Sequence, residues 1–383
     1  MNFSNISKNA VLVCLFLIFL ISTLSYAQTR VRTDVNFPDI PGYKTLICDF
    51  HMHTVFSDGN VWPTIRSEEA WRQGLDAIAI TDHIEYQPHK EDIPPNYNRA
   101  SEIALERGQQ LDILVIKGSE ITRDMPPGHL NAIFINDADK LRTETWREAI
   151  NAAAEQQAFI FWNHPGWRGQ QSDGISKWYD EHTEIFEAGN LHGIEVVNEK
   201  EYYPEVFQWC LDKNLTMLSN SDIHDPIQMD YDIPHGEHRP MTLVFAEVRT
   251  IEAIKQALFA RRTAVYWNNF LFGKKEFLEP LFYNSIFLNN PAVVLEGDQE
   301  KFIQITNTSD IDFKLQKNGE IGGIEAQSGV MLYSGKTVLY TIKRSDNTLK
   351  GDKKISIPFQ IENLKTAPED PLQVYLDLNI TFK

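Results

Sequence analysis

The chain has 383 residues, and its 53 Asp and Glu outnumber its 36 Lys and Arg, which gives a formal net charge of −17 at pH 7. Because the chain is acidic and has no run rich in Lys or Arg, it lacks the charge needed to neutralise a string of phosphates, which argues against a general nucleic-acid-binding protein. The composition is otherwise that of an ordinary globular protein, and the length favours two domains.

Residues 1–27 have the pattern of a cleaved signal peptide. Lys8 precedes an uninterrupted apolar run, Ala10–Ile21, and Ser25 and Ala27 are small residues at the two positions that a signal peptidase reads. A transmembrane anchor is the alternative, but the run is shorter than the roughly 20 residues needed to cross a bilayer. We therefore expect a mature chain that begins near Gln28, has no membrane anchor and is periplasmic or secreted.

Two cysteines remain in the expected mature chain, Cys48 on a predicted strand and Cys210 in a predicted helix. Two cysteines in a chain of this length are no disulfide framework. We expect both to be buried free thiols.

Residues 28–272 alternate short apolar runs with helical patterns. Continuous apolar strands separated by helices favour a parallel sheet covered on both faces, and the number of units favours an α/β barrel over an open sheet. The predicted strands are Thr45–Phe50, Ala77–Thr81, Ile113–Gly118, Leu130–Ile135, Phe159–Trp162, Gly193–Val197, Thr216–Ser219, Thr242–Ala246 and Thr263–Tyr266. The predicted helices are Pro63–Gln73, Asn98–Gly108, Thr143–Gln156, Pro204–Asn214 and Thr250–Ala260.

Residues 273–383 lose the helical periodicity and alternate instead between apolar and polar residues. In the last segment every second residue is apolar, which turns one side of a strand towards a core: Leu372, Val374, Leu376, Leu378, Ile380 and Phe382. Shorter alternations separated by Asn-Gly, Ser-Gly and Asp-Asn turns predict a small all-β, sandwich-like C-terminal domain. No cluster of candidate metal ligands lies in this segment of the sequence.

Nine residues of the types that bind hard or borderline metals lie at the ends of apolar runs. The signal is densest after the first predicted strand, where His51-Met52-His53 places two imidazoles on one side of an extended chain end, within reach of one ion. A lone histidine is more often a surface or core residue than a ligand, but the joint pattern predicts a multinuclear metal site. The nine residues are His51, His53, Asp58, His83, Glu120, His129, His164, Asp222 and His224.

Most of these residues follow a predicted strand directly. In a parallel barrel the carboxyl ends of all strands open on one face, where loop-borne residues assemble. We therefore expect the side chains to converge, although the sequence scatters them. His129 is the exception, because it precedes its strand, and only a turn that folds back would bring it to the same face.

Six short motifs carry these residues: His51-Met52-His53 with Ser57-Asp58-Gly59, Thr81-Asp82-His83, Gly118-Ser119-Glu120, Gly128-His129-Leu130, Asn163-His164-Pro165-Gly166 and Ser221-Asp222-Ile223-His224. With them, residues 45–260 resemble the polymerase and histidinol phosphatase (PHP) family. The resemblance implies a distorted seven-stranded α/β barrel around two or three metal ions. The exported two-domain plan, with the stretch from Arg239 to Phe245, is similar to the Sb-PDE-type phosphodiesterases of that family.

The resemblance also implies how the ligands divide among the ions. His51, His53 and Asp222 would hold one ion, Glu120 would bridge it to a second ion on His129 and His164, and Asp58, His83 and His224 would hold a third. This mixture of imidazoles and carboxylates suits Zn²⁺, Mn²⁺ or Fe²⁺ better than Ca²⁺ or Mg²⁺, which favour all-oxygen shells.

Such a cluster suits the hydrolysis of phosphate esters. Metals about 3.5 to 4 Å apart lower the pKa of a shared water, ligate a phosphoryl oxygen and neutralise charge on the leaving oxygen. Arg168 and Arg239 are candidates to meet the remaining negative charge, because a guanidinium matches two phosphate oxygens at once. His224 or His83 is a candidate proton donor if its metal site is empty. We predict a phosphodiesterase that acts on a small-molecule phosphate ester and forms no stable complex with nucleic acid.

Other functions stay open from the sequence: a phosphomonoesterase similar to histidinol phosphatase, a nuclease of the same family, or a binding module whose metals only stabilise the fold. Structural zinc sites tend to be closed and rich in cysteine, whereas this candidate site uses none, so the binding module is disfavoured. Export disfavours both a biosynthetic phosphatase and a proofreading nuclease, because their substrates are cytoplasmic.

Four further features lie near the predicted site. Glu195 approaches the same face, and we expect it to support a ligand rather than to bind a metal directly. His235 and His238 are expected at the rim. The tryptophan-rich stretch from Trp162 to Trp178 is either one wall of a substrate pocket or ordinary packing.

Overall fold

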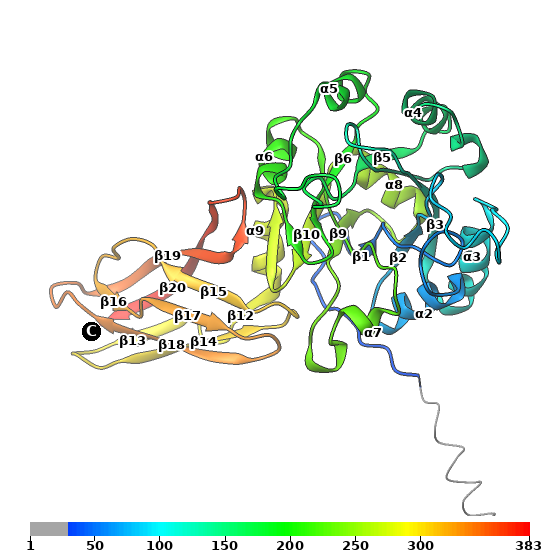
Figure 1. The fold of residues 1–383 in the computed structure, drawn as a ribbon. Coiled ribbons are helices and arrows are strands. Elements are labelled where there is room, and N and C mark those ends of the chain that lie inside the picture. The colour runs from blue at the N-terminus through cyan, green and yellow to red at the C-terminus, as the bar shows by residue number, and fades with distance from the viewer. Residues whose placement is uncertain (1–29) are drawn as a thin grey trace, which may run out of the picture. The chain divides into compact units, whose positions relative to one another are not determined.

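The computed structural model describes residues 30–383, of which Asp34–Lys383 form one compact unit (Figure 1). The expected signal peptide and its cleavage site lie outside the described residues. None of the helices within residues 30–383 is long and apolar enough to cross a membrane. Cys48 and Cys210 are buried free thiols, as predicted.

A curved sheet forms the framework of the first domain. Its strands are hydrogen-bonded in the order β9-β1-β2-β3-β4-β5-β6, and β8 pairs with the other edge of β6. The Thr242 hydroxyl in β9 accepts from the backbone N–H of Ser219 in β8 and donates to its carbonyl, both at 2.9 Å, so the sheet curves back on itself. The strands are β1 (Lys44–Asp49), β2 (Ala77–Ile80), β3 (Leu114–Ile121), β4 (Leu130–Ile133), β5 (Phe159–Trp162), β6 (Gly193–Asn198), β7 (Glu201–Tyr202), β8 (Thr216–Asn220) and β9 (Met241–Ala246).

Helices cover the outside of this sheet (Figure 1). Local sequence explains where two of them begin: Pro63 occupies the first turn of α2, where no backbone donor is needed, and Thr145 forms a capping box with Glu148 at the start of α4. Five predicted helices are present, and α5 and α7 are additions. The helices are α2 (Pro63–Arg72), α3 (Arg99–Leu111), α4 (Trp146–Glu155), α5 (Asp180–Glu187), α6 (Pro204–Asp212), α7 (Ile227–Asp230) and α8 (Ile251–Phe259).

The sheet is mixed, so the prediction of a parallel barrel is wrong at two strands. β1, β2 and β3 run parallel, as do β5, β6 and β8. β4 is antiparallel to both β3 and β5, and β9 is antiparallel to β1. A continuous apolar run has the same composition in either direction, so the pattern that predicted these strands could not tell which way they run.

The sheet continues beyond β9 into the C-terminal domain. β10 (Thr263–Trp267) and β11 (Phe270–Gly273) follow antiparallel, and Leu271 in β11 pairs in parallel with Leu364 in β19. Between the domains lies α9 (Lys275–Ser285), which buries Phe277, Leu278, Leu281 and Phe282. The expectation that helical structure ends at Gly273 is therefore wrong, because α9 follows that residue.

The C-terminal domain is all β, as predicted. One layer has the strand order β12-β14-β18-β16, and the other contains β13, β20, β19, β15 and β17. β20 alternates between buried and exposed residues along its length, so its apolar side faces the core as the sequence indicated. The strands are β12 (Ile286–Leu288), β13 (Ala292–Leu295), β14 (Lys301–Asn307), β15 (Phe313–Lys317), β16 (Ile324–Ala326), β17 (Gly329–Leu332), β18 (Thr337–Arg344), β19 (Gly351–Lys365) and β20 (Pro371–Phe382).

Candidate metal centre

The antiparallel direction of β4 explains how His129 reaches the other predicted ligands although it precedes its strand. Because β4 is antiparallel, its first residue, Leu130, pairs with Trp162 at the carboxyl end of β5 and with Ile121 at the carboxyl end of β3. His129 therefore emerges on the same face as Glu120 and His164, and its carbonyl accepts a 3.0 Å hydrogen bond from the N–H of Asn163. All nine predicted ligands thus gather at one end of the sheet, where its parallel strands finish.

A first group forms where β1 and β8 end. His51 Nε2 lies 3.1 Å from His53 Nε2, and each of these nitrogens lies 3.0 Å from Oδ1 of Asp222. Two imidazole nitrogens that face each other at this distance, with a carboxylate oxygen beside both, have the arrangement of donors around a shared cation.

Glu120 connects this first group to the other side of the cluster. Its Oε2 lies 3.4 Å from His53 Nε2 and 2.7 Å from His83 Nδ1. Its Oε1 lies 2.8 Å from His129 Nδ1 and 3.5 Å from His164 Nε2. The carboxylate therefore has one oxygen towards each of two sets of imidazoles, which is the geometry expected of a bridging ligand.

Asp58 is the centre of a third group. Its two oxygens lie 3.4 Å from His83 Nε2 and 3.3 Å from His224 Nε2. His53 Nδ1 is 3.7 Å from the same carboxylate, so His53 stands between this group and the first one. Donor atoms of these four residues all lie within 4.8 Å of one another.

Buried atoms without a hydrogen-bond partner show that this donor set fits divalent ions. Four such atoms belong to the predicted ligands: Glu120 Oε2, His129 Nδ1, His164 Nδ1 and Asp222 Oδ1. The short distances to neighbouring ligand atoms given above lack hydrogen-bond geometry. A buried polar atom without a partner is costly, and four in one cluster need an explanation. Cations held among them supply that explanation, and the set of imidazoles and carboxylates suits Zn²⁺, Mn²⁺ or Fe²⁺.

The shifted pKa values of the histidines in the cluster also fit a metal site. Burial, together with the neighbouring His224 and His83, lowers the pKa of His53 to about 3. Burial also acts to lower the pKa of His83, but the Glu120 and Asp58 carboxylates outweigh it and raise the pKa to about 10. Crowded imidazoles around carboxylates thus hold some protons tightly and exclude others, and a metal ion would compete with protons for the same nitrogens.

Glu195 supports the ligands from below, as expected. Its Oε1 lies 2.9 Å from Nδ1 of His51, and its Oε2 accepts a 2.7 Å bond from the N–H of His164. The side-chain amides of Asn198 and Asn220 donate to the same carboxylate. A carboxylate on the far nitrogen of a ligating histidine fixes its tautomer and its orientation.

Arg66 ties together the two loops that carry the first group, a role that sequence reasoning missed. This fully buried guanidinium donates to the carbonyls of His53, Ile223, His224 and Asp225 at 2.7 to 3.0 Å. Its charge is balanced by Glu69, one turn further along α2, at 2.8 Å. Nothing in the sequence pattern distinguishes this arginine from an exposed one on a surface helix.

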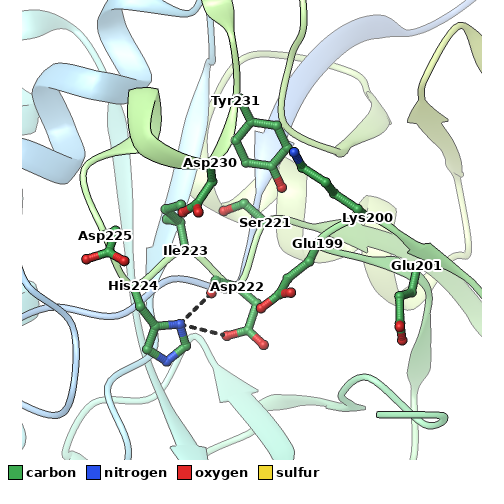
Figure 2. A pocket seen from close by; sticks show the side chains of 10 residues that line it. All are labelled: Glu199, Lys200, Glu201, Ser221, Asp222, Ile223, His224, Asp225, Asp230 and Tyr231. Carbon is green, nitrogen blue, oxygen red and sulfur yellow. Dashed lines mark hydrogen bonds and ion pairs between the residues drawn. The ribbon is translucent and has the colours of Figure 1, made fainter. Parts of the chain in front are cut away.

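The cluster opens on a cavity of about 490 Å³. Figure 2 shows the Glu199 and Asp222 carboxylates beside each other on its wall and the Lys200 amine next to the Tyr231 ring. Burial, with the neighbouring Asp222, raises the pKa of Glu199 to about 7. The residues lining the cavity are Glu199, Lys200, Glu201, Ser221, Asp222, Ile223, His224, Asp225, Asp230 and Tyr231.

A solved structure with the same two-domain plan decides the family. It is a two-domain protein from Bacteroides vulgatus ATCC 8482 containing a predicted PHP-like metal-dependent phosphoesterase, and it is 44% identical to this chain. The match covers 92% of this chain and 100% of that one, with a TM-score of 0.86. The chain belongs to the PHP family.

Other comparisons cover less of the chain. A family model described as an Ig-like domain, DUF5001, matches residues 288–377, so the PHP domain is followed by an Ig-like domain. The uncharacterized protein MJ1295 of Methanocaldococcus jannaschii is 42% identical over 81 residues, which are 21% of this chain and only 34% of that protein. A putative metal-dependent phosphoesterase from Bifidobacterium adolescentis is 18% identical, covers 46% of this chain and 87% of its own, and has a TM-score of 0.37.

Arg239 is buried and does not line the cavity of this PHP protein, so the prediction that it meets the charge of the substrate is wrong. Its side chain is 0% exposed, forms an ion pair with Asp49 at 2.8 Å, and donates from Nε to Gln73. The cause is again strand direction: β9 is antiparallel to β1, so Arg239, just before β9, lies beside the carboxyl end of β1 and pairs with Asp49 there.

Arg168 is also not brought to the cluster. Its guanidinium is exposed and donates to the carbonyl of Ser172 within its own loop. His224, the third predicted catalytic residue, does line the cavity, and its side chain is 32% exposed. His235 and His238 lie outside the nine-residue cluster, as expected.

The tryptophan-rich stretch contains both a core residue and an exposed residue beside the cluster, so each of the two interpretations, ordinary packing and pocket wall, applies to part of it. Trp162 is fully buried and stacks on His182 with ring centroids 3.6 Å apart, so it belongs to the core. Trp167 is exposed and touches the cluster, with its ring 5.3 Å from that of His164. Lys200 and Glu199, which line the cavity, were missed because neither belongs to a motif.

Proposed function

We propose that the chain is an exported metal-dependent phosphoesterase that hydrolyses small-molecule phosphodiesters. One observation carries the proposal: nine imidazole and carboxylate side chains, most of them from separate strand ends, meet in one cluster that opens on a polar cavity. The Bacteroides vulgatus relative, which contains a predicted PHP-like metal-dependent phosphoesterase, supports the same class of reaction.

Divalent ions on this donor set supply an activated water and Lewis acidity towards a phosphoryl oxygen. The residues of the chain do the rest. Glu120 fixes the spacing of the imidazoles on its two sides, and Glu195 fixes the ring of His51. His224, which lines the cavity, is placed to give a proton to the departing alcohol oxygen when the group around Asp58 holds no ion.

The charge of the cavity favours a diester over a monoester. Lys200 is the one Lys or Arg among the described residues that line it, whereas Glu201, Asp225 and Asp230 add carboxylates and Glu199 is partly ionised near pH 7. A diester has a single negative charge, and a monoester has nearly two. With Arg239 buried and Arg168 turned away, the second charge would face carboxylates instead of a guanidinium. The same carboxylates would repel the long polyanion that a nuclease must bind.

The test is to purify the chain from Gln28, count its bound metals and compare kcat/KM on bis(4-nitrophenyl) phosphate and 4-nitrophenyl phosphate. We expect two or three divalent ions per chain and a higher kcat/KM for the diester. A higher kcat/KM for the monoester would make the protein a phosphatase. No hydrolysis of either ester by the metal-loaded protein would overturn the proposal.

Lys200 can be tested against a matched lysine. Lys200→Ala should lower kcat/KM on the diester by about tenfold, the scale of one lost charge contact to the phosphate. Lys177→Ala is the control, because Lys177 is also exposed and paired with a carboxylate, Asp173, but does not line the cavity.

Export is proposed on the sequence of residues 1–27. Mass spectrometry of the protein from the exported fraction of the producing cells should give an N-terminus near Gln28. A chain that keeps residues 1–27 and stays in the cytoplasm would contradict it.

A further inference from the structure

Two half-exposed aromatic side chains touch the imidazoles of the metal centre. Trp167 is 46% exposed, and its ring lies 5.3 Å from His164 and 5.8 Å from His129, centroid to centroid. Tyr86 is 52% exposed, and its ring lies 5.8 Å from His83. Because the His83 and His129 rings are themselves 5.7 Å apart, the two aromatic side chains flank a continuous row of ligand imidazoles.

The loop around Trp167 is built to seat its ring. A Cβ added to Gly169 would lie 2.5 Å from Cζ2 and Cη2 of the indole, so the ring packs directly against this glycine backbone. The backbone N–H of Trp167 donates to the carbonyl of His164 at 2.9 Å, which fixes the backbone of Trp167 relative to a predicted metal ligand. One side of the indole is thus held by the loop, and nearly half of its surface stays exposed beside the cluster.

We propose that Trp167, with Tyr86 as the second wall, is a stacking platform for a flat aromatic ring in the ester substrate. This inference rests on the proposed function, because it places the phosphate over the metal centre and the ring beside it. The substrate class is therefore a phosphate ester in which one alcohol carries an aromatic ring, recognised by ring stacking rather than by hydrogen bonds.

Trp62, the other exposed tryptophan among residues 30–383, lacks this setting. Trp62 is 47% exposed, but its ring packs on Phe56 at 5.4 Å and has no ring contact with a cluster imidazole. It has the same chemistry and the same exposure as Trp167, so it provides a matched control. The exposed part of the Trp167 indole loses its contact with water only when a ligand covers it, which favours an apolar ligand. Because the indole surface is flat, a flat aromatic ring covers it best.

The experiment uses phenylphosphonate and cyclohexylphosphonate, which the protein cannot hydrolyse because the carbon–phosphorus bond is not an ester. Their affinity for the metal-loaded chain is measured by calorimetry, with inorganic phosphate as the reference ligand. We expect phenylphosphonate to bind about tenfold more tightly than cyclohexylphosphonate, the scale of one base-to-aromatic stacking contact. Trp167→Ala should abolish this preference, Trp167→Phe should keep part of it, and Trp62→Ala should keep all of it.

Gly169→Ala provides a second variant that retains the indole. The added methyl group must displace the ring, so the preference should fall although Trp167 is still present. Equal affinity of the two phosphonates in the unmodified protein, with inorganic phosphate still bound, would overturn the platform and leave the phosphoesterase proposal standing. Failure of all three ligands to bind the metal-loaded chain would overturn the platform, whereas the comparison of the two 4-nitrophenyl esters decides the phosphoesterase proposal separately.

Discussion

Arg239 Nη1 lies 2.8 Å from Asp49 Oδ2, and both side chains are 0% exposed. Asp49 in turn accepts hydrogen bonds from the N–H and hydroxyl of Ser221, the residue before the ligand Asp222. The arginine that sequence reasoning assigned to substrate is therefore a buried support that acts on the metal centre through one carboxylate.

Removing this arginine should destabilise the fold. Arg239→Ala leaves Asp49 buried without its partner, and we expect the free energy of unfolding to fall by about 3 to 5 kcal/mol. Urea denaturation measures the loss, with Arg168→Ala as the control, because Arg168 is exposed and its guanidinium bonds only within its own loop. An Arg239→Ala protein of unchanged stability that had lost only diester hydrolysis would restore the substrate role.

The second prediction concerns the ligands. His53 takes part in two of the groups placed to hold a metal, so His53→Ala should lose at least one ion per chain and nearly all activity while the fold survives. His235→Ala is the matched control, because the His235 side chain is 83% exposed and pairs with Asp232 instead. Elemental analysis of both variants, with circular dichroism for the fold, decides the matter. Unchanged metal content in His53→Ala would remove His53 from the ligand set.

Glu195 gives a third prediction, about orientation rather than binding. Glu195→Gln keeps the size of the side chain but puts an amide where three donors and His51 need acceptors, so His51 loses its fixed orientation. We expect metal affinity to fall by about 10 to 100-fold. Competition with a chelator measures this, and Glu184→Gln, which only breaks an exposed pair with Arg147, should leave the affinity unchanged. Equal affinities in the two variants would show that Glu195 is dispensable.

The sequence predicted residue types and strand ends well, and strand directions poorly. His51, His53, His164 and Asp222 could be placed because each follows an apolar run, and the carboxyl ends of parallel strands share a face. The position of His129 could not be derived, because the direction of β4 depends on pairing with β3 and β5, which leaves no trace in a short apolar run.

The same cause explains the error at Arg239, which precedes the antiparallel strand β9. Arg66 was missed for another reason: its partners are backbone carbonyls, which every sequence contains. Helix α9 was missed because it contains Pro280, a residue that argues against a helix interior, although its buried positions follow the helical period. The sequence therefore failed to show strand direction and side-chain bonds to backbone carbonyls, and it misled at a helix that contains proline.

The last prediction concerns acid stability and rests on His182. This histidine is buried against Trp162, and its Nε2 lies 2.7 Å from the carbonyl of Pro127, while its Nδ1 accepts from the N–H of Tyr179. Burial lowers its pKa to about 4, although the Pro127 carbonyl acts in the opposite direction. The ring is therefore neutral in the folded protein, and the unfolded chain binds a proton more readily.

The difference in pKa between the folded and unfolded states determines how the stability depends on pH. The contribution of His182 to stability is fully present above the unfolded pKa, near 6.5, and is lost as the pH falls through about 4. The loss over this range is on the order of 3 kcal/mol. Urea denaturation between pH 7 and pH 4, with a chelator present so that metal release does not contribute, should show a shallower pH dependence for His182→Gln than for the unmodified chain. His235→Gln should keep the original slope, because that side chain is exposed. The same slope in His182→Gln as in the unmodified protein would contradict the prediction, because it would mean that folding leaves the pKa of His182 unchanged.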